Sequence, residues 1–323
     1  MSKVAIIGYG NLGRGVEQAL KQNTDLELVG VFSRRDPKTV HTDGAPVYAL
    51  DKLEEQKGNI DVCILCGGSA TDLPVQTPAI TKNFNTVDSF DTHARIPEHF
   101  AAVDQAAKEN QTVSIISTGW DPGLFSLNRL YAQSILPVGE TYTFWGKGVS
   151  QGHSDALRRI KGVADAIQYT IPKNEVIERL KAGEKMNLTT RDKHFRECFV
   201  VLEENADAKA VKQEIVTMPN YFDEYDTEVH FISAEELKRD HQAMPHGGTV
   251  LRTGTTHENT KQVIEYNLQL ESNPEFTGSV LVAYARACAR LAKEKQFGAF
   301  TVLDIAPKYL SSADDATLRK ELL

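Results

Sequence analysis

Three glycines spaced G-x-G-x-x-G near the start of the chain could hold the diphosphate of a dinucleotide. Gly8, Gly10 and Gly13 follow four apolar residues and precede apolar residues at helical spacing. A buried strand, a tight turn and a helix in this order bring backbone amides and the positive helix end to the phosphates. The turn needs Gly8, the approach of the phosphates needs Gly10, and packing of the helix on the strand needs Gly13. The predicted phosphate loop comprises Gly8, Tyr9, Gly10, Asn11, Leu12 and Gly13.

Ser33, Arg34 and Arg35 follow the second predicted strand, residues 26–32. At this point an NAD enzyme usually carries an Asp or Glu, which accepts hydrogen bonds from the ribose 2′-hydroxyl. This chain has a hydroxyl and two guanidinium groups instead, which suit a 2′-phosphate through forked, charge-assisted contacts. A solvated basic turn would have the same composition. We expect the cofactor to be NADP rather than NAD.

Two aspartates, Asp91 and Asp121, lie in loops that follow later predicted strands. Both loops belong to the carboxyl edge of the sheet, where the nicotinamide end of a dinucleotide lies. Carboxylates at that edge could hold a cation or accept a proton. Turn formation or helix capping explains the same residues, above all for Asp121, which precedes Pro122 and a helix. Both interpretations remain open on the spacing alone.

Two Gly-rich loops in the second half of the chain carry histidines. In residues 146–155, amides near Gln151 and Gly152 could hold a carboxylate at the start of a helix that Ser154 or Asp155 would cap. His153 in this loop could act as a general acid or base, although capping or packing explains it better. The loop 244–248 presents a second histidine, His246, which suits a ligand contact more than a core position.

Metal and thiol chemistry are not indicated. Histidines and cysteines occur nowhere in metal-ligand spacing, so we expect no metal. Cys63 and Cys66 form C-x-x-C, but inside a predicted strand, where residues three apart face opposite sides. We interpret them as buried structural thiols.

Composition limits the class of protein. The 323 residues suffice for about two domains. A net charge of −8 argues against a nucleic-acid-binding protein. No apolar run approaches the ~20 residues of a membrane span, and a strand that starts at Lys3 leaves no room for a signal peptide. With four unpatterned cysteines, the expected location is the cytoplasm.

Strand and helix patterns alternate over the first 120 residues, which predicts an α/β fold with a Rossmann-type, doubly wound parallel sheet. We expect this NADP-binding domain to cover residues 1–122 and to be completed by residues 276–323, including a last strand at 300–305. Residues 123–275 read as a second, α+β domain for substrate binding and dimerisation. Its mixed or antiparallel sheet would use the strands 141–145, 195–202, 227–232, 250–253 and 262–270.

Taken together, these residues resemble the NADP-dependent meso-diaminopimelate D-dehydrogenases nearly end to end. The segments that carry the resemblance are 8–14, 32–35, 118–123 (TGWDPG), 144–146, 150–160 (SQGHSDALRRI), 244–248 and 298–303. The chain departs from the family at Gly68, where the pattern has Met, which affects local nucleotide contacts only.

The resemblance implies a reaction and a set of residues. Hydride would pass from the D-configured α-carbon of meso-2,6-diaminopimelate to NADP, and hydrolysis of the imine would give L-2-amino-6-oxopimelate and ammonia. The reverse reaction is a reductive amination that feeds lysine and peptidoglycan precursors. The residues implied at the D-centre are Asp91, Trp120, Asp121, Trp145, Gln151 and Gly152, and those at the L-centre are Thr170, Arg196, His246 and Asn273. Asp91 or Asp121 would accept the proton, with His153 in reserve, and the family is homodimeric.

Loops at the carboxyl strand ends would supply the remaining cofactor contacts. Besides the phosphate loop and 33–35, the expected contacts are Cys66, Gly67, Gly68, Ser69, Ser89, Phe90, Asp91, Thr118, Gly119, Trp120, Asp121 and Pro122. Two alternatives stand beside this interpretation. One is another NADP-dependent reductase of similar layout, such as one that acts on dihydrodipicolinate, although the chain lacks a basic cluster for a cyclic diacid. The other is a non-catalytic NADP sensor, against which the paired aspartates argue.

Overall fold

The computed structural model describes residues 1–258 and 260–323. The chain divides into two compact units, one of Met1–Leu127 with Pro274–Leu323 and one of Asn128–Asn273. Among the described residues, no helix combines the length and apolarity that crossing a membrane would require.

The first unit contains a seven-stranded sheet in the order β14-β6-β5-β4-β1-β2-β3, and each neighbouring pair is parallel. Its strands are β1 (Ser2–Ile7), β2 (Leu26–Ser33), β3 (Val47–Ala49), β4 (Val62–Leu65), β5 (Asn85–Asp88), β6 (Val113–Ile115) and β14 (Gly298–Phe300). The strand order reverses between β1 and β4, so the loops after these two strands flank the crevice where such sheets bind nucleotides. The predicted doubly wound parallel sheet is confirmed.

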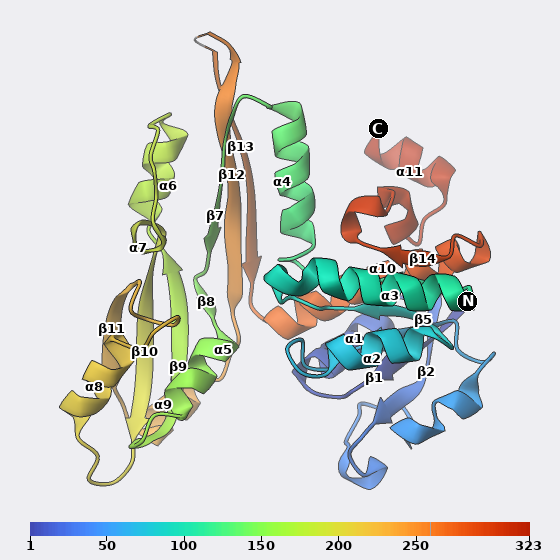
Figure 1. The fold of residues 1–323 in the computed structure, drawn as a ribbon, viewed down its shortest axis with the longest axis horizontal. Helices are drawn as coiled ribbons and strands as arrows, with labels where there is room; N and C mark the ends of the chain where they lie inside the picture. Colours follow the sequence, from blue (N-terminus) through green and yellow to red (C-terminus); the bar gives the residue numbers. More distant parts are fainter. Residues whose placement is uncertain (259) are drawn as a thin grey trace. The chain divides into compact units, whose positions relative to one another are not determined.

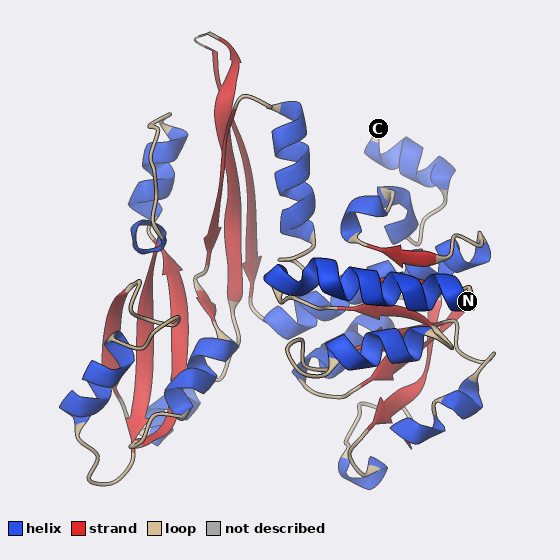
Figure 2. Ribbon diagram, in the orientation of Figure 1, coloured by secondary structure: helices blue, strands red, loops and turns tan. Residues whose placement is uncertain are grey.

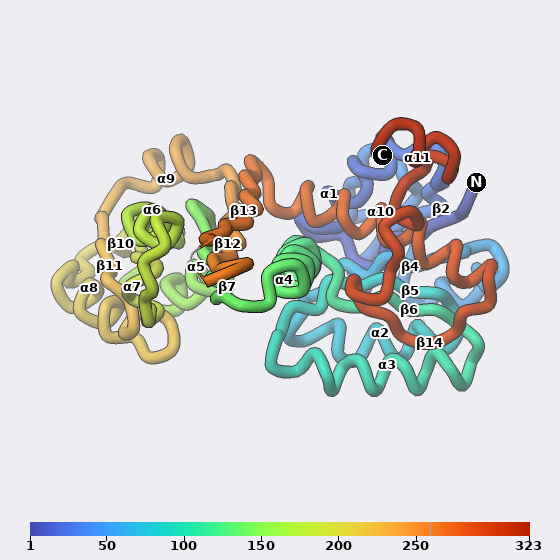
Figure 3. The backbone as a smooth tube through the Cα atoms, turned by 90° about the horizontal axis from the view of Figure 1, so that it is seen from above, coloured from blue at the N-terminus to red at the C-terminus, as the bar shows by residue number. Residues whose placement is uncertain are grey.

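Helices cover both faces of this sheet (Figure 3). The helices of this unit are α1 (Asn11–Lys21), α2 (Leu73–Thr81), α3 (Ile96–Asn110), the first turn of α4 (Leu124–Ile135), α10 (Asn273–Lys293) and α11 (Asp315–Leu322). Along β1, Val4 and Ile6 join the core that α1 and α10 cover, whereas Ala5 and Ile7 join the core on the side of α2. This burial on both faces explains why the strand is apolar throughout.

The last strand is shorter than the sequence predicts. β14 ends at Phe300, and residues 302–304 form a 3-10 turn instead of continuing the strand. Thr301 and Asp304 form a capping box at this turn, which satisfies the amides that a strand would have paired. The expectation of a strand over 300–305 is therefore wrong beyond Phe300.

The second unit contains two sheets, which Figure 2 shows in red. The four-stranded sheet has the order β11-β10-β9-β8, with β10–β11 parallel and the other pairs antiparallel. Its strands are β8 (Gly148–Val149), β9 (Val163–Pro172), β10 (His194–Leu202) and β11 (Asp226–Phe231). The three-stranded sheet is antiparallel and consists of β7 (Gly139–Trp145), β12 (His246–His257) and β13 (Thr260–Leu270). The predicted mixed or antiparallel character is confirmed, although the strands form two sheets instead of one and β12 is far longer than the expected 250–253.

Short helices pack on the faces of the four-stranded sheet (Figure 1). The helices of this unit, besides the rest of α4, are α5 (Gln151–Arg158), α6 (Asn174–Lys181), α7 (Thr190–Lys193), α8 (Ala208–Val216) and α9 (Ala234–Asp240). Leu157 of α5 and Ile215 of α8 share a core with Cys198 of β10, while Leu237 of α9 packs on the opposite face with Ile167. The helix α5 begins at Gln151 with Ser150 as its N-cap, so the prediction of Ser154 or Asp155 as the cap is wrong.

Candidate active site

The loop after β1 has the geometry of a phosphate loop. Gly8 adopts φ +89°, which favours glycine, and a Cβ on Gly13 would lie 2.5 Å from the carbonyl oxygen of Gly8. A Cβ on Gly10 would meet nothing within 4 Å, so the space beside the start of α1 is open. The first turn of α1 carries no acidic residue. The positive end of α1 therefore suits a bound anion.

The residues after β2 reach toward the same crevice. The backbone amide of Arg35 donates to Ser33 Oγ at 3.0 Å, and the Arg35 guanidinium donates to the Tyr9 carbonyl oxygen of the phosphate loop. The guanidinium of Arg34, whose side chain is 64% exposed, pairs with Asp72 at 2.8 Å. A hydroxyl and two guanidinium groups beside an open phosphate loop fit a dinucleotide with a 2′-phosphate.

The loop after β4 connects the phosphate loop with Asp91. A Cβ on Gly8 would lie 3.5 Å from the Cys66 backbone, so the two loops touch at the point where the strand order reverses. In the same loop, Gly68 N donates to Asp72 Oδ2 at 2.9 Å, and Ser69 Oγ accepts from Asp91 N at 2.8 Å. Cys63 and Cys66 pack into the cores on opposite sides of the sheet and form no disulfide, as the strand periodicity predicts.

A buried carboxylate that the sequence analysis did not identify holds two further loops. Asp88, the last residue of β5, is fully buried. It accepts hydrogen bonds from Thr77 Oγ1 at 2.8 Å, Phe90 N at 3.0 Å and Ser117 N at 2.9 Å. His99 Nε2 of α3 lies 2.7 Å from the same carboxylate. Four partners from separate segments satisfy this buried charge, as its burial requires.

This network attaches residues 89–91 and 118–122 to the same buried residue, Asp88. The carbonyl oxygen of Asp88 also accepts from Thr118 N at 2.9 Å. Asp91 is exposed and Asp121 half-buried, while Trp120 is only 8% exposed and packs edge-on against Phe125 at 5.2 Å. Hydrogen bonds within the first unit thus connect the predicted cofactor loops and the segments that carry both candidate acids. Asp88 and His99 gave no motif signal; only the position of Asp88 at the end of a buried strand could have identified it.

Arg196 of β10 is the main charged group of the predicted substrate residues in the second unit. It is 5% exposed, its Nη1 donates to Thr170 Oγ1 of β9, and its Cζ lies 3.8 Å from the ring centroid of Tyr225. Burial lowers the pKa of this guanidinium below its usual range. Among the described residues, no carboxylate forms an ion pair with Arg196. A buried cation in this state is suited to an anionic group of a ligand.

Trp145 and His246 belong to the same unit. Trp145 N donates to His194 Nε2 at 2.8 Å, and the two rings stack at 5.5 Å. Burial, followed by the charge of Arg196, lowers the pKa of His194 to about 3. A Cβ on Gly148 would lie 2.5 Å from the His246 ring, so only glycine allows this approach. Burial also lowers the pKa of His246.

The start of α5 presents Gln151 and Gly152, both exposed. The Gln151 amide lies 3.2 Å from Met244 Sδ, and Asn273 N donates to the carbonyl oxygen of Met244 at 2.9 Å, so all three lie near the loop before β12. His153 lies 2.7 Å from Ser150 Oγ through Nδ1 and packs against Phe222. Burial lowers the pKa of His153 to about 4, which favours the neutral, packed form.

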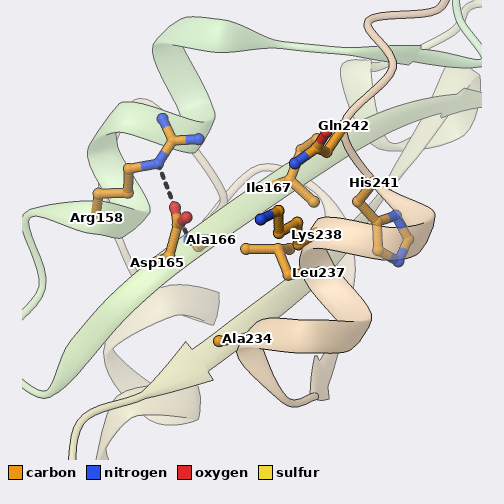
Figure 4. Close-up of a pocket in the computed structure, with 9 residues that line it drawn as sticks. All are labelled: Arg158, Asp165, Ala166, Ile167, Ala234, Leu237, Lys238, His241 and Gln242. Atoms are coloured by element: carbon orange, nitrogen blue, oxygen red, sulfur yellow. Dashed lines mark hydrogen bonds and ion pairs between the residues drawn. The ribbon is translucent and has the colours of Figure 1, made fainter.

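Two other features of the second unit contain none of the predicted substrate residues. A pocket of about 340 Å³ lies between α5, β9 and α9, where Arg158 Nε donates to Asp165 Oδ1 at 2.8 Å (Figure 4). Glu197, Glu228 and His230 place their potential ligand atoms within 4.8 Å of one another.

Comparison with known proteins identifies the family. The model of the diaminopimelic acid dehydrogenase C-terminal domain matches residues 119–272. The meso-diaminopimelate D-dehydrogenase of Ureibacillus thermosphaericus is 62% identical over 322 residues, which cover 99% of each chain. This chain belongs to the meso-diaminopimelate D-dehydrogenase family. The resemblance that the sequence motifs predicted is therefore confirmed.

Solved structures of family members match the whole fold. A six-fold substituted meso-diaminopimelate dehydrogenase from Clostridium tetani, solved with DAP, is 55% identical with a TM-score of 0.95, and the match covers 100% of both chains. An engineered D-amino acid dehydrogenase bound to NADP⁺ is 43% identical with a TM-score of 0.87, covering 100% of this chain and 99% of that one.

Proposed function

We propose that this protein is an NADP-dependent meso-diaminopimelate D-dehydrogenase. It oxidatively deaminates the D-centre of meso-2,6-diaminopimelate, giving L-2-amino-6-oxopimelate and ammonia, and the reaction is reversible. Family membership supports the reaction, and the engineered relative bound to NADP⁺ supports the cofactor. The observation within this chain that best supports the substrate is the buried Arg196, which has no ion pair among the described residues and matches a distant carboxylate.

The substrate carries two ammonium groups and two carboxylates. At the L-centre, Arg196 binds the carboxylate through a forked contact, and Thr170, His246 and Asn273 complete the polar surroundings. The six substituted positions of the Clostridium tetani variant have the same residue types, in the same order and spacing, as Gln151, Thr170, Arg196, Pro245, His246 and Asn273. All of these except Pro245 are among the residues that the family resemblance implied, which supports their assignment to the substrate.

At the D-centre, Asp91 and Asp121 hold the ammonium group and accept its proton. Hydride can leave the α-carbon only while the nitrogen lone pair forms the imine, so the nitrogen must first be deprotonated. A carboxylate at hydrogen-bond distance provides the base for this step. Trp120, Trp145, Gln151 and Gly152 are assigned to the same end. NADP, when bound, supplies the hydride acceptor.

Cofactor binding is assigned to the open phosphate loop, to Ser33, Arg34 and Arg35, and to the loops that contact or follow them. Residues 66–69, 89–91 and 118–122 complete that set. Stereoselectivity follows because both ends of the substrate are amino acids of opposite configuration. A site that pairs the charges of a D-configured centre leaves the charges of an L-configured centre unpaired. We further propose a homodimer in the cytoplasm, as the family resemblance and the cysteine content imply.

The test is NADPH absorbance on mixing the protein with NADP and the meso, L,L and D,D isomers of diaminopimelate, each repeated with NAD. We expect a rise with the meso isomer and NADP, none with the L,L isomer, which lacks a D-centre, and a much smaller rise with NAD. NADP binding without turnover of any isomer would instead favour the sensor. Turnover of a cyclic dihydropyridine diacid, but not of the meso isomer, would favour the alternative reductase.

A further inference from the structure

Polar side-chain atoms without hydrogen-bond partners gather on one face of the four-stranded sheet. Among the described residues, Gln168 Nε2 and Oε1, Arg196 Nε and Thr227 Oγ1 are buried and have no partner. They come from three neighbouring strands, β9, β10 and β11. Buried polar atoms are normally paired, so a local group of exceptions indicates a place for ligand atoms.

Strand register places these residues side by side. Arg196 pairs with Thr170 on β9 and with Thr227 on β11, and Gln168 pairs with Cys198. Residues two apart on a strand share a face, so Gln168 lies on the face of Thr170 and is a diagonal neighbour of Arg196. Diagonal neighbours in an antiparallel pair are about 7–8 Å apart, within reach of long side chains.

Gln168 is fully buried in the unliganded fold. It is 0% exposed, and α5 begins directly beside it: Gln168 N donates to Ser154 Oγ at 3.0 Å, and Ser150 N donates to the Gln168 carbonyl oxygen at 3.1 Å. The shared face continues into the apolar core with Cys198 and Ala166. An amide at the edge of an apolar core, with neither end bonded, destabilises the unliganded fold.

We propose that Gln168 is a specificity-determining residue for the L-centre, and that its amide oxygen accepts a hydrogen bond from the ammonium group there. This rests on the proposed function. Arg196 provides donors for the carboxylate but no acceptor for the adjacent ammonium group. Thr170 Oγ1 already accepts from Arg196. The side-chain amide oxygen of Gln168 is a neutral acceptor, so it can bind an ammonium group. Because it carries no charge, it does not form an ion pair with Arg196 and leaves that guanidinium to the substrate carboxylate.

The first test is Gln168→Met, which keeps the length of the side chain and removes its polar atoms. We expect KM for meso-diaminopimelate to rise about tenfold, the loss of one hydrogen bond to a charged group, with little change in kcat or in KM for NADP. The melting temperature of the unliganded protein should stay the same or increase. Gln213→Met, at an exposed position on α8, is the matched control and should leave every parameter unchanged.

The second test compares substrates in the same variant. D-2-aminopimelate lacks the second amino group, so its kcat/KM should change less than about twofold in Gln168→Met. If D-2-aminopimelate is not turned over, its inhibition constant against meso-diaminopimelate is measured instead, and the same limit applies. This ratio between substrates does not depend on the fraction of folded enzyme. The proposal would be overturned if Gln168→Met lowered kcat/KM equally for both ligands, whether or not the melting temperature also fell. An unchanged KM for meso-diaminopimelate would overturn it as well. Activity of the unsubstituted enzyme with meso-diaminopimelate tests the proposed function separately.

Discussion

The two units each bury a charged side chain beside residues assigned to the reaction, but they treat that charge in opposite ways. Asp88 of the first unit is fully buried and has four hydrogen-bond partners within the unit. Arg196 of the second unit is almost as buried, yet it contacts one hydroxyl and an aromatic face, and no carboxylate among the described residues pairs with it.

The difference separates a scaffold from a binding surface. Partners supplied by the fold keep the Asp88 loops in place whether or not a ligand is bound. A buried cation without an anion costs folding free energy that a bound carboxylate can recover. Under the proposed function, the first unit is therefore organised in advance for the cofactor and the candidate acids, whereas the polar face of the second unit would be completed by the substrate.

The largest expected effect is a loss of turnover when a candidate acid on the loops held by Asp88 is replaced. Asp121→Asn removes a proposed proton acceptor and the charge proposed to hold the D-ammonium group, so kcat/KM should fall by about 100-fold or more. NADP affinity, measured by fluorescence titration, should be retained. Unchanged turnover would remove Asp121 from the site, and the exposed Asp315→Asn on α11 serves as a control.

Asp88→Asn tests the scaffold itself. The amide that replaces one carboxylate oxygen cannot accept from all four partners, which should cost about 1–3 kcal/mol of unfolding free energy. Activity should fall because both acid-bearing loops lose their common anchor, whereas the preference for meso-diaminopimelate over D-lysine, which depends on Arg196, should persist. Loss of that preference would contradict the proposal that the first unit holds the loops in place while the second unit selects the substrate. Denaturant titration and a two-substrate assay measure both quantities.

Arg34→Ala tests whether Arg34 binds the 2′-phosphate of NADP. The side chain is 64% exposed, so its removal should leave stability unchanged. NADP affinity should fall by about tenfold through loss of a charge-assisted contact, while NAD affinity should hardly change. Equal losses for both cofactors would contradict the assignment of Arg34 to the 2′-phosphate.

The smallest expected effect concerns pH. Burial holds the pKa of His194 at about 3 in the fold, against 6.5 in an unfolded chain. The unfolded state therefore binds a proton that the folded state does not, so this contribution to stability is complete above pH 6.5 and decreases as the pH falls toward 3. Melting temperatures between about pH 7.5 and 5 should decline less steeply for His194→Gln than for the unsubstituted protein.

Sequence patterns predicted the elements whose signal is local. The strand before Gly8, the phosphate loop and the strand expected at 195–202 lie where periodicity and turn chemistry place them. The start of α5 was predicted wrongly because Ser150 caps it through its backbone position, while its hydroxyl lies beside the His153 ring. The end of β14 was missed because a capping box diverts the chain.

The site residues divide in the same way. The position of Arg34 and Arg35 at the nucleotide crevice could be predicted because they follow a strand directly, whereas their contact with a cofactor stays a prediction. Three of the four partners of Asp88 come from α2, α3 and the loop after β6, and no spacing along the chain connects them with Asp88. Gln168 gave no signal either, because a glutamine inside a strand is distinguished only by the absence of partners in the folded chain.

The central claim is that no carboxylate among the described residues pairs with Arg196 because the distant carboxylate of the substrate is its partner. The direct measurement is kcat/KM of the unsubstituted enzyme and of Arg196→Met with meso-diaminopimelate and with D-lysine, which has no distant carboxylate. The account predicts a loss of about tenfold or more for meso-diaminopimelate and nearly none for D-lysine. The same loss with both substrates, or a change confined to KM for NADP, would contradict it.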